Sequence, residues 1–231
     1  LNGAFTGGIG GLINIVTKKP SRKAVYSANA EFDSFGSKIG RIDISQPLSR
    51  DGKWLMRGNL EEGEYDSFAR HTSSEKRGGS VVFQGQLSQR DTLTLSFEKR
   101  WQNADAYSGL PGFVATGSGA QAHLVALPAY SRDLNVEDPR SAWDFNSTTG
   151  RIAWEHAFNA DWSFRSSSQY TTTSRNMLSI YANPVMSGGR VLYRQAFSNI
   201  LMGPVNAIDT DNVFHGKMSI LGHHNDLIAG E

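Results

Sequence analysis

The start of the chain is rich in glycine, a residue common in loops that bind phosphate groups. Four glycines fall within residues 7–11, and glycine lets backbone amides approach a pyrophosphate closely. A dinucleotide loop, however, follows a strand and opens a helix, whereas these glycines precede a β-branched run at residues 12–17 that favours a strand. Lys18 and Lys19 also lack the hydroxyl residue that directly follows the lysine of a P-loop. We therefore expect a glycine turn that leads into a short strand, which Pro20 ends.

Metal-binding and catalytic constellations are equally weak. His223 and His224 are adjacent, so on a strand their side chains would point to opposite faces, and we expect both in a solvated turn. The other histidines are scattered, and Ser, His and Asp form no constellation in the sequence. Glu98 and Glu155 could be the two carboxylates of a glycosidase, but that role requires a particular distance between the two carboxyl groups, and the sequence does not give it. The residue pattern therefore identifies no catalytic residues, no metal site and no cofactor site.

The composition narrows the class of protein. The chain has 231 residues, 39% of them hydrophobic, and no stretch approaches the roughly 18 apolar residues of a transmembrane helix. A transmembrane barrel remains possible, because its strands alternate apolar and polar residues. The net charge is +1 without a basic run, so we expect no nucleic-acid partner, and the absence of cysteine excludes disulfides. The chain begins without Met or a signal peptide, so we expect a fragment.

Alternation with a period of two dominates the sequence. In the clearest segment Leu93, Leu95 and Phe97 alternate with threonine, serine and glutamate. No segment has a convincing 3.6-residue period, so we expect an all-β fold of about nine antiparallel strands, most of them near ten residues long. Ten residues at about 3.3 Å each, tilted near 45°, span roughly 23 Å, which matches the apolar band of an outer membrane.

The expected connections alternate between short and long. Outer-membrane barrels have short periplasmic turns and long extracellular loops, whereas a soluble sandwich has no reason to separate the two kinds. Short turns are expected at residues 49–52, 89–91, 159–161 and 222–225, and long polar loops at residues 65–75, 105–144 and 176–212.

The two faces of the strands differ in polarity. One face carries Ile, Leu, Phe, Met, Trp and Ala, and we expect it to contact lipid; the other is polar and is expected to line a wide lumen. The charged residues expected on the lumen face are Glu31, Arg41, Asp43, Arg57, Glu61, Glu98, Arg100, Arg151, Glu155 and Arg165.

Four aromatic residues are expected at the membrane interfaces. Trp54 and Trp162 directly follow short turns, where the inner girdle would lie. Trp101 and Tyr170 are expected at the far ends of their strands, where an outer girdle belongs. The alternative interpretation is that all four are core aromatics of a soluble sheet.

Residues 7–20 closely resemble the end of the plug domain in TonB-dependent outer-membrane receptors. In that family a glycine cluster leads into an Ile-Asn-Ile-Val-Thr-Lys strand and a proline before the barrel begins. Residues 33–37 resemble the first outer turn, and residues 46–53 the first periplasmic turn. The stretches that resemble the siderophore-receptor branch are residues 109–112, 127–128, 154–158 and 161–162.

The resemblance implies a fold and a function. Residues 1–20 would be the C-terminal end of the plug, and residues 21–231 the N-terminal part of an antiparallel transmembrane β-barrel of about 22 strands. The intact protein would lie in the bacterial outer membrane, in contact with its lipid, and import ferric siderophores. TonB would energise it through a segment absent from this chain. It would be a transporter rather than an enzyme, with iron carried as the siderophore complex and not as a cofactor.

The family places ligand contacts on the plug, the inner barrel wall and the outer loops. The loop at residues 105–144 is therefore the candidate here, because aromatic rings can stack on an iron chelate and arginine can pair with it. Each residue could instead pack the loop or anchor it at the interface. The candidates are Tyr107, Phe113, Tyr130, Arg132 and Trp143.

Two alternatives remain open. A receptor of the same family could import haem, cobalamin or carbohydrate instead of a ferric siderophore. A protein of another class, a soluble all-β ligand-binding module such as a lectin-like sandwich, would need protein to cover the apolar strand face.

Overall fold

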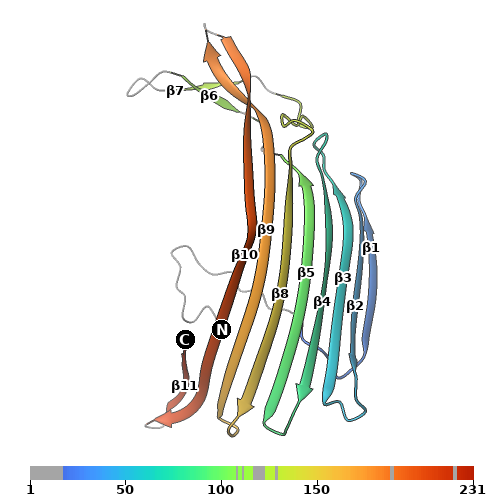
Figure 1. The fold of residues 1–231 in the computed structure, drawn as a ribbon, viewed down its shortest axis with the longest axis vertical. Helices are drawn as coiled ribbons and strands as arrows, with labels where there is room; N and C mark the ends of the chain where they lie inside the picture. Colours follow the sequence, from blue (N-terminus) through green and yellow to red (C-terminus); the bar gives the residue numbers. More distant parts are fainter. Residues whose placement is uncertain are drawn as a thin grey trace.

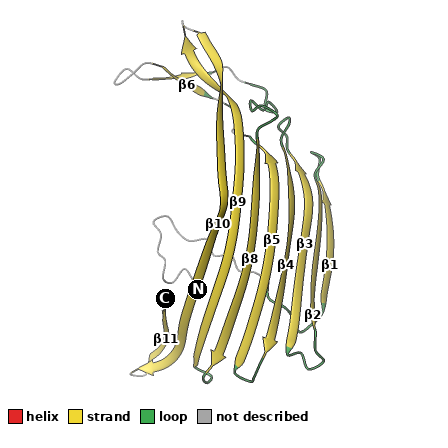
Figure 2. Ribbon diagram, in the orientation of Figure 1, coloured by secondary structure: helices red, strands yellow, loops and turns green. Residues whose placement is uncertain are grey.

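The computed structural model describes residues 18–107, 109–110, 112–116, 123–127, 130–187, 190–220 and 223–231. In these ranges the chain is all-β, and no helix long and apolar enough to cross a membrane is present (Figure 2). Nine strands form one antiparallel sheet in the order β1-β2-β3-β4-β5-β8-β9-β10-β11 (Figure 1). The predicted antiparallel all-β fold is therefore confirmed, and the sheet is not closed.

The strands of the sheet differ widely in length. They are β1 (Val25–Phe32), β2 (Lys38–Pro47), β3 (Trp54–Asp66), β4 (Ser73–Gln86), β5 (Asp91–Asp105), β8 (Ala142–Ala157), β9 (Trp162–Ser187), β10 (Arg190–Ile220) and β11 (His223–Gly230). A separate hairpin pairs β6 (Phe113–Thr116) with β7 (His123–Ala126).

The tight turns lie where glycine or a short polar sequence allows them. Gly52 has a φ of 67°, and its amide donates to the carbonyl of Ser49, 3.1 Å away, between β2 and β3. Gly36 has a φ of 107° in the turn at residues 33–37. The β2–β3, β4–β5 and β8–β9 turns lie together at the lower end of the sheet in Figure 1. We name the upper end, where the long β5–β8 connection lies, the rim.

Two of the expected connections are wrong. Residues 176–212 are not a loop, because β9 and β10 pair from Trp162 opposite Gly216 up to Ser187 opposite Arg190. A single register shift between Met202 and Val205 accommodates Pro204, which has no amide hydrogen to donate. The turn expected at residues 222–225 is also displaced, because His223 and His224 are already paired within β11.

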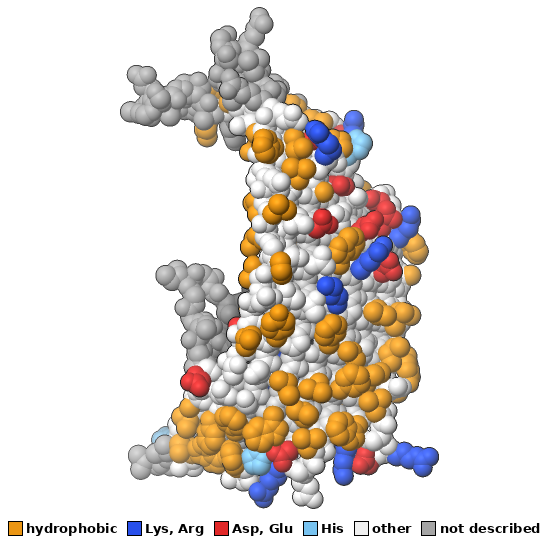
Figure 3. All heavy atoms as spheres, viewed as in Figure 1, with side chains coloured by type: hydrophobic (Ala, Val, Ile, Leu, Met, Phe, Trp, Pro, Cys, Tyr) orange, Lys and Arg blue, Asp and Glu red, His pale blue; other side chains and the backbone are white. Residues whose placement is uncertain are grey.

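The sheet is a single layer whose faces differ in polarity. Residues directly opposite each other in an antiparallel pair share a face, so the pairing of Arg41 with Glu61 and of Glu98 with Thr149 gives one polar face, which we name the inner wall. The opposite, outer face is apolar, and Leu60 is 62% exposed on it and Phe97 50%. Figure 3 shows this outer face, with hydrophobic side chains gathered in its lower half and charged ones both above them and along the bottom edge. Within the described ranges no second layer of this chain covers the apolar side chains, as a sandwich would require.

Residues 1–17 lie outside the described residues. The expected plug strand and its boundary at residue 20 therefore stay predictions. The residues that follow, from Lys18 to Ser21, lie against the inner wall of β2 and β3 through the contacts given below.

Candidate functional site

The inner wall of β1–β3 carries a charge network that joins three strands. Arg41 on β2 donates from Nε to Glu61 on β3 and from Nη1 to Glu31 on β1, both at 2.8 Å. Tyr65 donates from its hydroxyl to the other oxygen of Glu61, also at 2.8 Å. Side chains alternate between the two faces along each strand, and the register of β1, β2 and β3 places these residues on the same face. The alternation and the register together therefore bring the charged groups into contact.

A second part of the network holds the segment that precedes β1. Arg57 donates from Nε and Nη2 to the two carboxylate oxygens of Asp43, at 2.9 and 2.6 Å, and from Nη1 to the Lys19 carbonyl at 3.0 Å. The Arg57 and Asp43 side chains are only 14% and 15% exposed. Lys18 Nζ lies 3.0 Å from the same carboxylate. Asp43 is therefore paired with Arg57 in a nearly buried setting and with Lys18, which is 66% exposed, from the solvent side.

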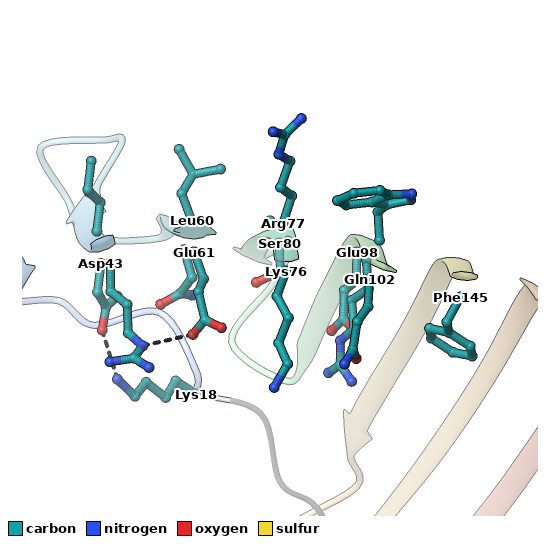
Figure 4. A pocket seen from close by; sticks show the side chains of 17 residues that line it. Lys18, Asp43, Leu60, Glu61, Lys76, Arg77, Ser80, Glu98, Gln102 and Phe145 are labelled. Carbon is teal, nitrogen blue, oxygen red and sulfur yellow. Dashed lines mark hydrogen bonds and ion pairs between the residues drawn. The ribbon is translucent and has the colours of Figure 1, made fainter. Parts of the chain in front are cut away.

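A cavity of about 560 Å³ opens beside this network on the inner wall (Figure 4). Its polar lining also includes Lys76, Glu98, Arg100 and Gln102, with Phe145 at its far side. Charged groups of both signs and an aromatic ring suit a polar, multidentate solute better than an apolar one. Among the described residues no cluster of three or more His, Asp or Glu side chains is placed to hold a metal ion.

The rim holds an aromatic and basic cluster built from two loops. The Phe68 and Tyr107 rings meet edge to face with centroids 6.2 Å apart, and the Arg132 guanidinium lies 5.2 Å from the Phe68 centroid. Arg70 fixes the arrangement, because its Nε lies 2.6 Å from the Asp133 carboxylate and its amide donates to the Asp133 carbonyl. We name Phe68, Tyr107 and Arg132 the rim cluster.

The other candidate residues lie elsewhere. Trp143 is not in a loop but near the start of β8, on the inner wall, with the Arg175 guanidinium 5.8 Å from its ring centroid. Tyr130 is half-buried in the long loop. Phe113 begins β6, and its side chain lies outside the described part of the structure. The structure thus unites two of the five candidates, Tyr107 and Arg132.

The loop between β7 and β8 is tied to its neighbours on both sides. Asn135 donates from Nδ2 to Thr72 Oγ1 at 3.1 Å and to the Ala106 carbonyl at 3.2 Å. Ser141, which is 1% exposed, accepts from the Ile180 amide at 2.7 Å. These bonds connect the loop to the β3–β4 connection, to the end of β5 and to the tall part of β9.

The same loop contains one strongly shifted acid. The Arg140 guanidinium donates to both carboxylate oxygens of Asp138, at 2.8 and 2.9 Å. With the additional Arg140 backbone amide, this pairing lowers the pKa of Asp138 to about 2. The Asp138 carboxylate, with its pKa at about 2, is therefore ionised and paired with Arg140 throughout the neutral range.

Comparison with known proteins agrees with this geometry. No protein-family model matches the chain. The metal-pseudopaline receptor CntO of Pseudomonas aeruginosa is 29% identical over 161 residues, which are 70% of this chain and 22% of that protein. The ferric-pyoverdine M114 receptor PbuA of Pseudomonas sp. is 24% identical over 232 residues, 97% of this chain and 26% of that protein. The chain therefore spans about a quarter of the length of these relatives.

Solved structures carry the same sheet. The FpvAI–pyocin S2 complex matches 98% of this chain and 28% of that chain with a TM-score of 0.82 at 18% identity. The ferripyoverdine receptor of the outer membrane of Pseudomonas aeruginosa, bound to ferripyoverdine, matches 92% of this chain and 28% of that chain with a TM-score of 0.77 at 17% identity. The resemblance to TonB-dependent siderophore receptors is confirmed. The relatives are receptors by name, and none is named as an enzyme.

The four predicted girdle residues all lie on the outer face of the sheet. Trp54 and Trp162 start β3 and β9 at the lower end, and Trp162 belongs to a belt of rings in contact, with Phe214 5.4 Å away. The expectation that Tyr170 ends its strand is wrong, because β9 continues to Ser187. Tyr170 nevertheless lies eight residues above Trp162 along β9. Trp101 lies at the corresponding height, because it pairs with Arg77, which in turn pairs with Glu62, eight residues above Trp54 on β3. Their interfacial role stays a prediction.

The sequence analysis missed three residues that belong to the rim cluster or the inner wall: Phe68, Phe145 and Arg175. Phe68 follows β3 and meets Tyr107 only because the strand order brings the two loops together. Phe145 and Arg175 lie directly opposite each other on the inner wall of β8 and β9. The alternation of side chains along a strand could have predicted Phe145 and Arg175. Both have odd residue numbers, and the odd-numbered residues of β8 and β9, such as Arg151 and Arg165, face the inner wall.

Proposed function

We propose that the intact protein containing this chain is an outer-membrane receptor that imports ferric siderophores, energised through TonB. The observation that supports this proposal best is that the two faces of the sheet differ in polarity. The inner wall has a charge-lined cavity below the rim cluster of Phe68, Tyr107 and Arg132. The outer face exposes apolar side chains such as Leu60 and Phe97. The relatives support the substrate class, because they are receptors for ferric pyoverdine and for metal-pseudopaline.

In this proposal the rim cluster makes the first contacts with the ligand, and the inner wall binds it further down. The aromatic edges and the Arg132 guanidinium would hold the planar or anionic parts of an iron chelate at the entrance. Alternating charges below would then offer exchangeable ion pairs along the wall, from the rim toward the cavity beside Arg41 and Glu61. No step in this scheme needs a nucleophile, a general base or a resident metal.

The decisive experiment uses the full-length gene in a strain lacking its own siderophore receptors. We expect uptake of radioactive iron from a ferric siderophore, and loss of that uptake when TonB is deleted while surface binding persists. Haem, cobalamin and carbohydrate are tested in the same strain. Uptake of one of these and not of any ferric chelate would replace the proposed substrate class.

A second candidate follows from one relative. CntO is a receptor for metal-pseudopaline, so the ligand could be a metallophore loaded with a metal other than iron. The same strain distinguishes the two, because uptake of nickel, cobalt or zinc complexes would then exceed uptake of ferric complexes.

A further inference from the structure

Residues 18–21 are held on the inner wall although they belong to no strand. Pro20 has no amide hydrogen, so a regular ladder through this segment would lack a hydrogen bond. Three other bonds attach the segment to β2 and β3, and Figure 4 shows the first of them. They join Lys18 Nζ to the Asp43 carboxylate at 3.0 Å, Arg57 Nη1 to the Lys19 carbonyl at 3.0 Å, and the Ser21 amide to Ser45 Oγ at 2.8 Å. We name Asp43, Ser45 and Arg57 the clamp.

The clamp is fixed by the ladder register and by burial. Arg57 lies directly opposite Ser45 in the β2–β3 ladder and reaches diagonally to Asp43. Ser45 is fully buried, and the Arg57 and Asp43 side chains are nearly so. Water reaches these groups poorly, so a group that loses its partner here finds no ready substitute. The clamp therefore releases residues 18–21 less easily than exposed side chains would.

The position of the clamp along the chain gives it a mechanical role in an energised importer. In the proposed receptor TonB supplies energy through a segment outside this chain. A load that arrives from the N-terminal side must cross residues 18–21 before it reaches β1. If these residues came off the wall, the load would pass directly to β1 and to its ladder with β2. The three bonds of the clamp therefore lie between the load and the first strand of the sheet.

We infer that Arg57 is a positioning residue for import. Together with Asp43 and Ser45 it keeps residues 18–21 on the wall while the receptor is energised, so that the load stops before β1. The guanidinium suits this role because its planar fork serves both Asp43 oxygens and the Lys19 carbonyl at the same time. The inference rests on the proposed function, because it needs a receptor that is energised for import.

The test uses the full-length receptor in a strain that lacks its own siderophore receptors, with and without TonB. This chain contains no cysteine, so Ser21→Cys supplies one thiol for a small, water-soluble maleimide once any cysteine elsewhere in the receptor is replaced by serine. With Arg57 in place we expect the labelling rate to agree within twofold with and without TonB. In Arg57→Gln we expect TonB to raise the labelling rate at least fivefold.

Uptake is measured on the same variants. Arg57→Gln should lower the maximum rate of ferric-chelate uptake at least fivefold. The equilibrium affinity for the chelate should stay within twofold, because Arg57 does not line the cavity of the inner wall. The control is Lys38→Gln, which breaks an exposed pair with Glu64 on the outer face and should leave both quantities unchanged.

A charge exchange separates positioning from folding. Asp43→Arg combined with Arg57→Asp keeps opposite charges on β2 and β3, but it leaves the Lys19 carbonyl without its donor and places a like charge beside Lys18. We expect the melting temperature to recover toward that of the unmodified receptor. Uptake and labelling should stay as in Arg57→Gln, because the segment is still released.

Two results would overturn the inference. The first is faster labelling of Ser21→Cys with TonB in a receptor that keeps Arg57, because the segment would then leave the wall during normal import. The second is full uptake by Arg57→Gln or by the charge exchange. A receptor that imports ferric chelates and gives either result loses this inference alone. A receptor that imports none of the tested ligands loses the proposed function and this inference together.

Discussion

The indole ring of Trp162 lies over Gly216, its direct neighbour across the β9–β10 ladder, in the space that a Cβ atom would occupy. Trp54 covers Gly85 in the same way between β3 and β4. Each tryptophan begins its strand at the lower end of the sheet, and each glycine lets the ring pack flat on the neighbouring backbone. The paired residues thus anchor the lower belt by packing as well as by polarity.

Gly216→Ala should therefore destabilise the folded protein. The added methyl group collides with the Trp162 ring, and overpacking of this kind costs about 1–3 kcal/mol. Urea unfolding in lipid vesicles, followed by tryptophan fluorescence, measures the change. The control is Gly150→Ala, because an added Cβ there has nothing within 4 Å, and we expect a change below about 0.5 kcal/mol. Equal destabilisation by both substitutions would contradict the explanation.

Arg57→Gln should loosen the segment before β1. The substitution removes the bidentate partner of a nearly buried Asp43 and one donor to the Lys19 carbonyl, which we expect to cost about 2–3 kcal/mol. Hydrogen exchange should accelerate at the Ser21 amide, which donates to the buried Ser45 hydroxyl at 2.8 Å. Lys38→Gln breaks only an exposed pair and should change stability by less than about 0.5 kcal/mol. Unchanged exchange at residues 18–21 in the Arg57 variant would remove this role.

Arg132→Gln and Phe68→Ala should each weaken binding of the ferric chelate that supports uptake, by about tenfold. The reason is loss of the cation–π and edge contacts that build the rim cluster, worth about 0.5–2 kcal/mol each. Equilibrium binding to purified receptor gives the affinity. Arg90→Gln, in the short β4–β5 turn at the opposite end, should leave it unchanged. A rim cluster that only packs the loop would leave all three affinities equal.

Acid should loosen the β7–β8 loop only at very low pH. The folded-state pKa of Asp138 lies at about 2, below its ordinary value of 3.8, so the contribution of the ionised carboxylate is complete above that ordinary value and disappears as the pH falls through about 2. Arg140→Gln removes the main cause of the low pKa, so the transition should move up toward 3.8. Hydrogen exchange of residues 138–141 between pH 2 and 5 measures it. A transition at the same pH in both proteins would exclude Arg140 as the cause.

Sequence patterning predicted the fold because period two fixes which side chains share a face. The charged residues expected in the lumen, such as Arg41, Glu61 and Arg151, do fall on the inner wall through the ladder register. The tall β9–β10 hairpin was missed because Pro184 and the Gly203–Pro204 pair suggest a loop. In the structure Pro184 is paired with Tyr193, and Pro204 falls at a register shift where no ladder hydrogen bond needs its nitrogen.

The candidate ligand site was harder to predict than the fold. Choosing aromatic and arginine residues from one long loop found Tyr107 and Arg132 but not Phe68, which joins them from another connection. Contacts between loops depend on strand order and loop conformation, and residue type alone encodes neither. Trp143 was placed in the loop because the expected loop was extended to residue 144, past the turn at residues 138–141 that directly precedes β8. Its Arg175 partner lies on β9 just before the stretch that the sequence analysis took for a loop.

The hydrogen bonds of Asn135 and Ser141 limit how the β7–β8 loop can move. A lid hinged only at its ends could swing freely, but this loop is bonded midway to Thr72 and Ala106 and near its end to Ile180. Any inward movement must either break these bonds or bend the top of β9 and β10 along with the loop. The β7–β8 loop is thus coupled to the upper part of the β9–β10 hairpin, and in the proposed receptor the two would have to move together.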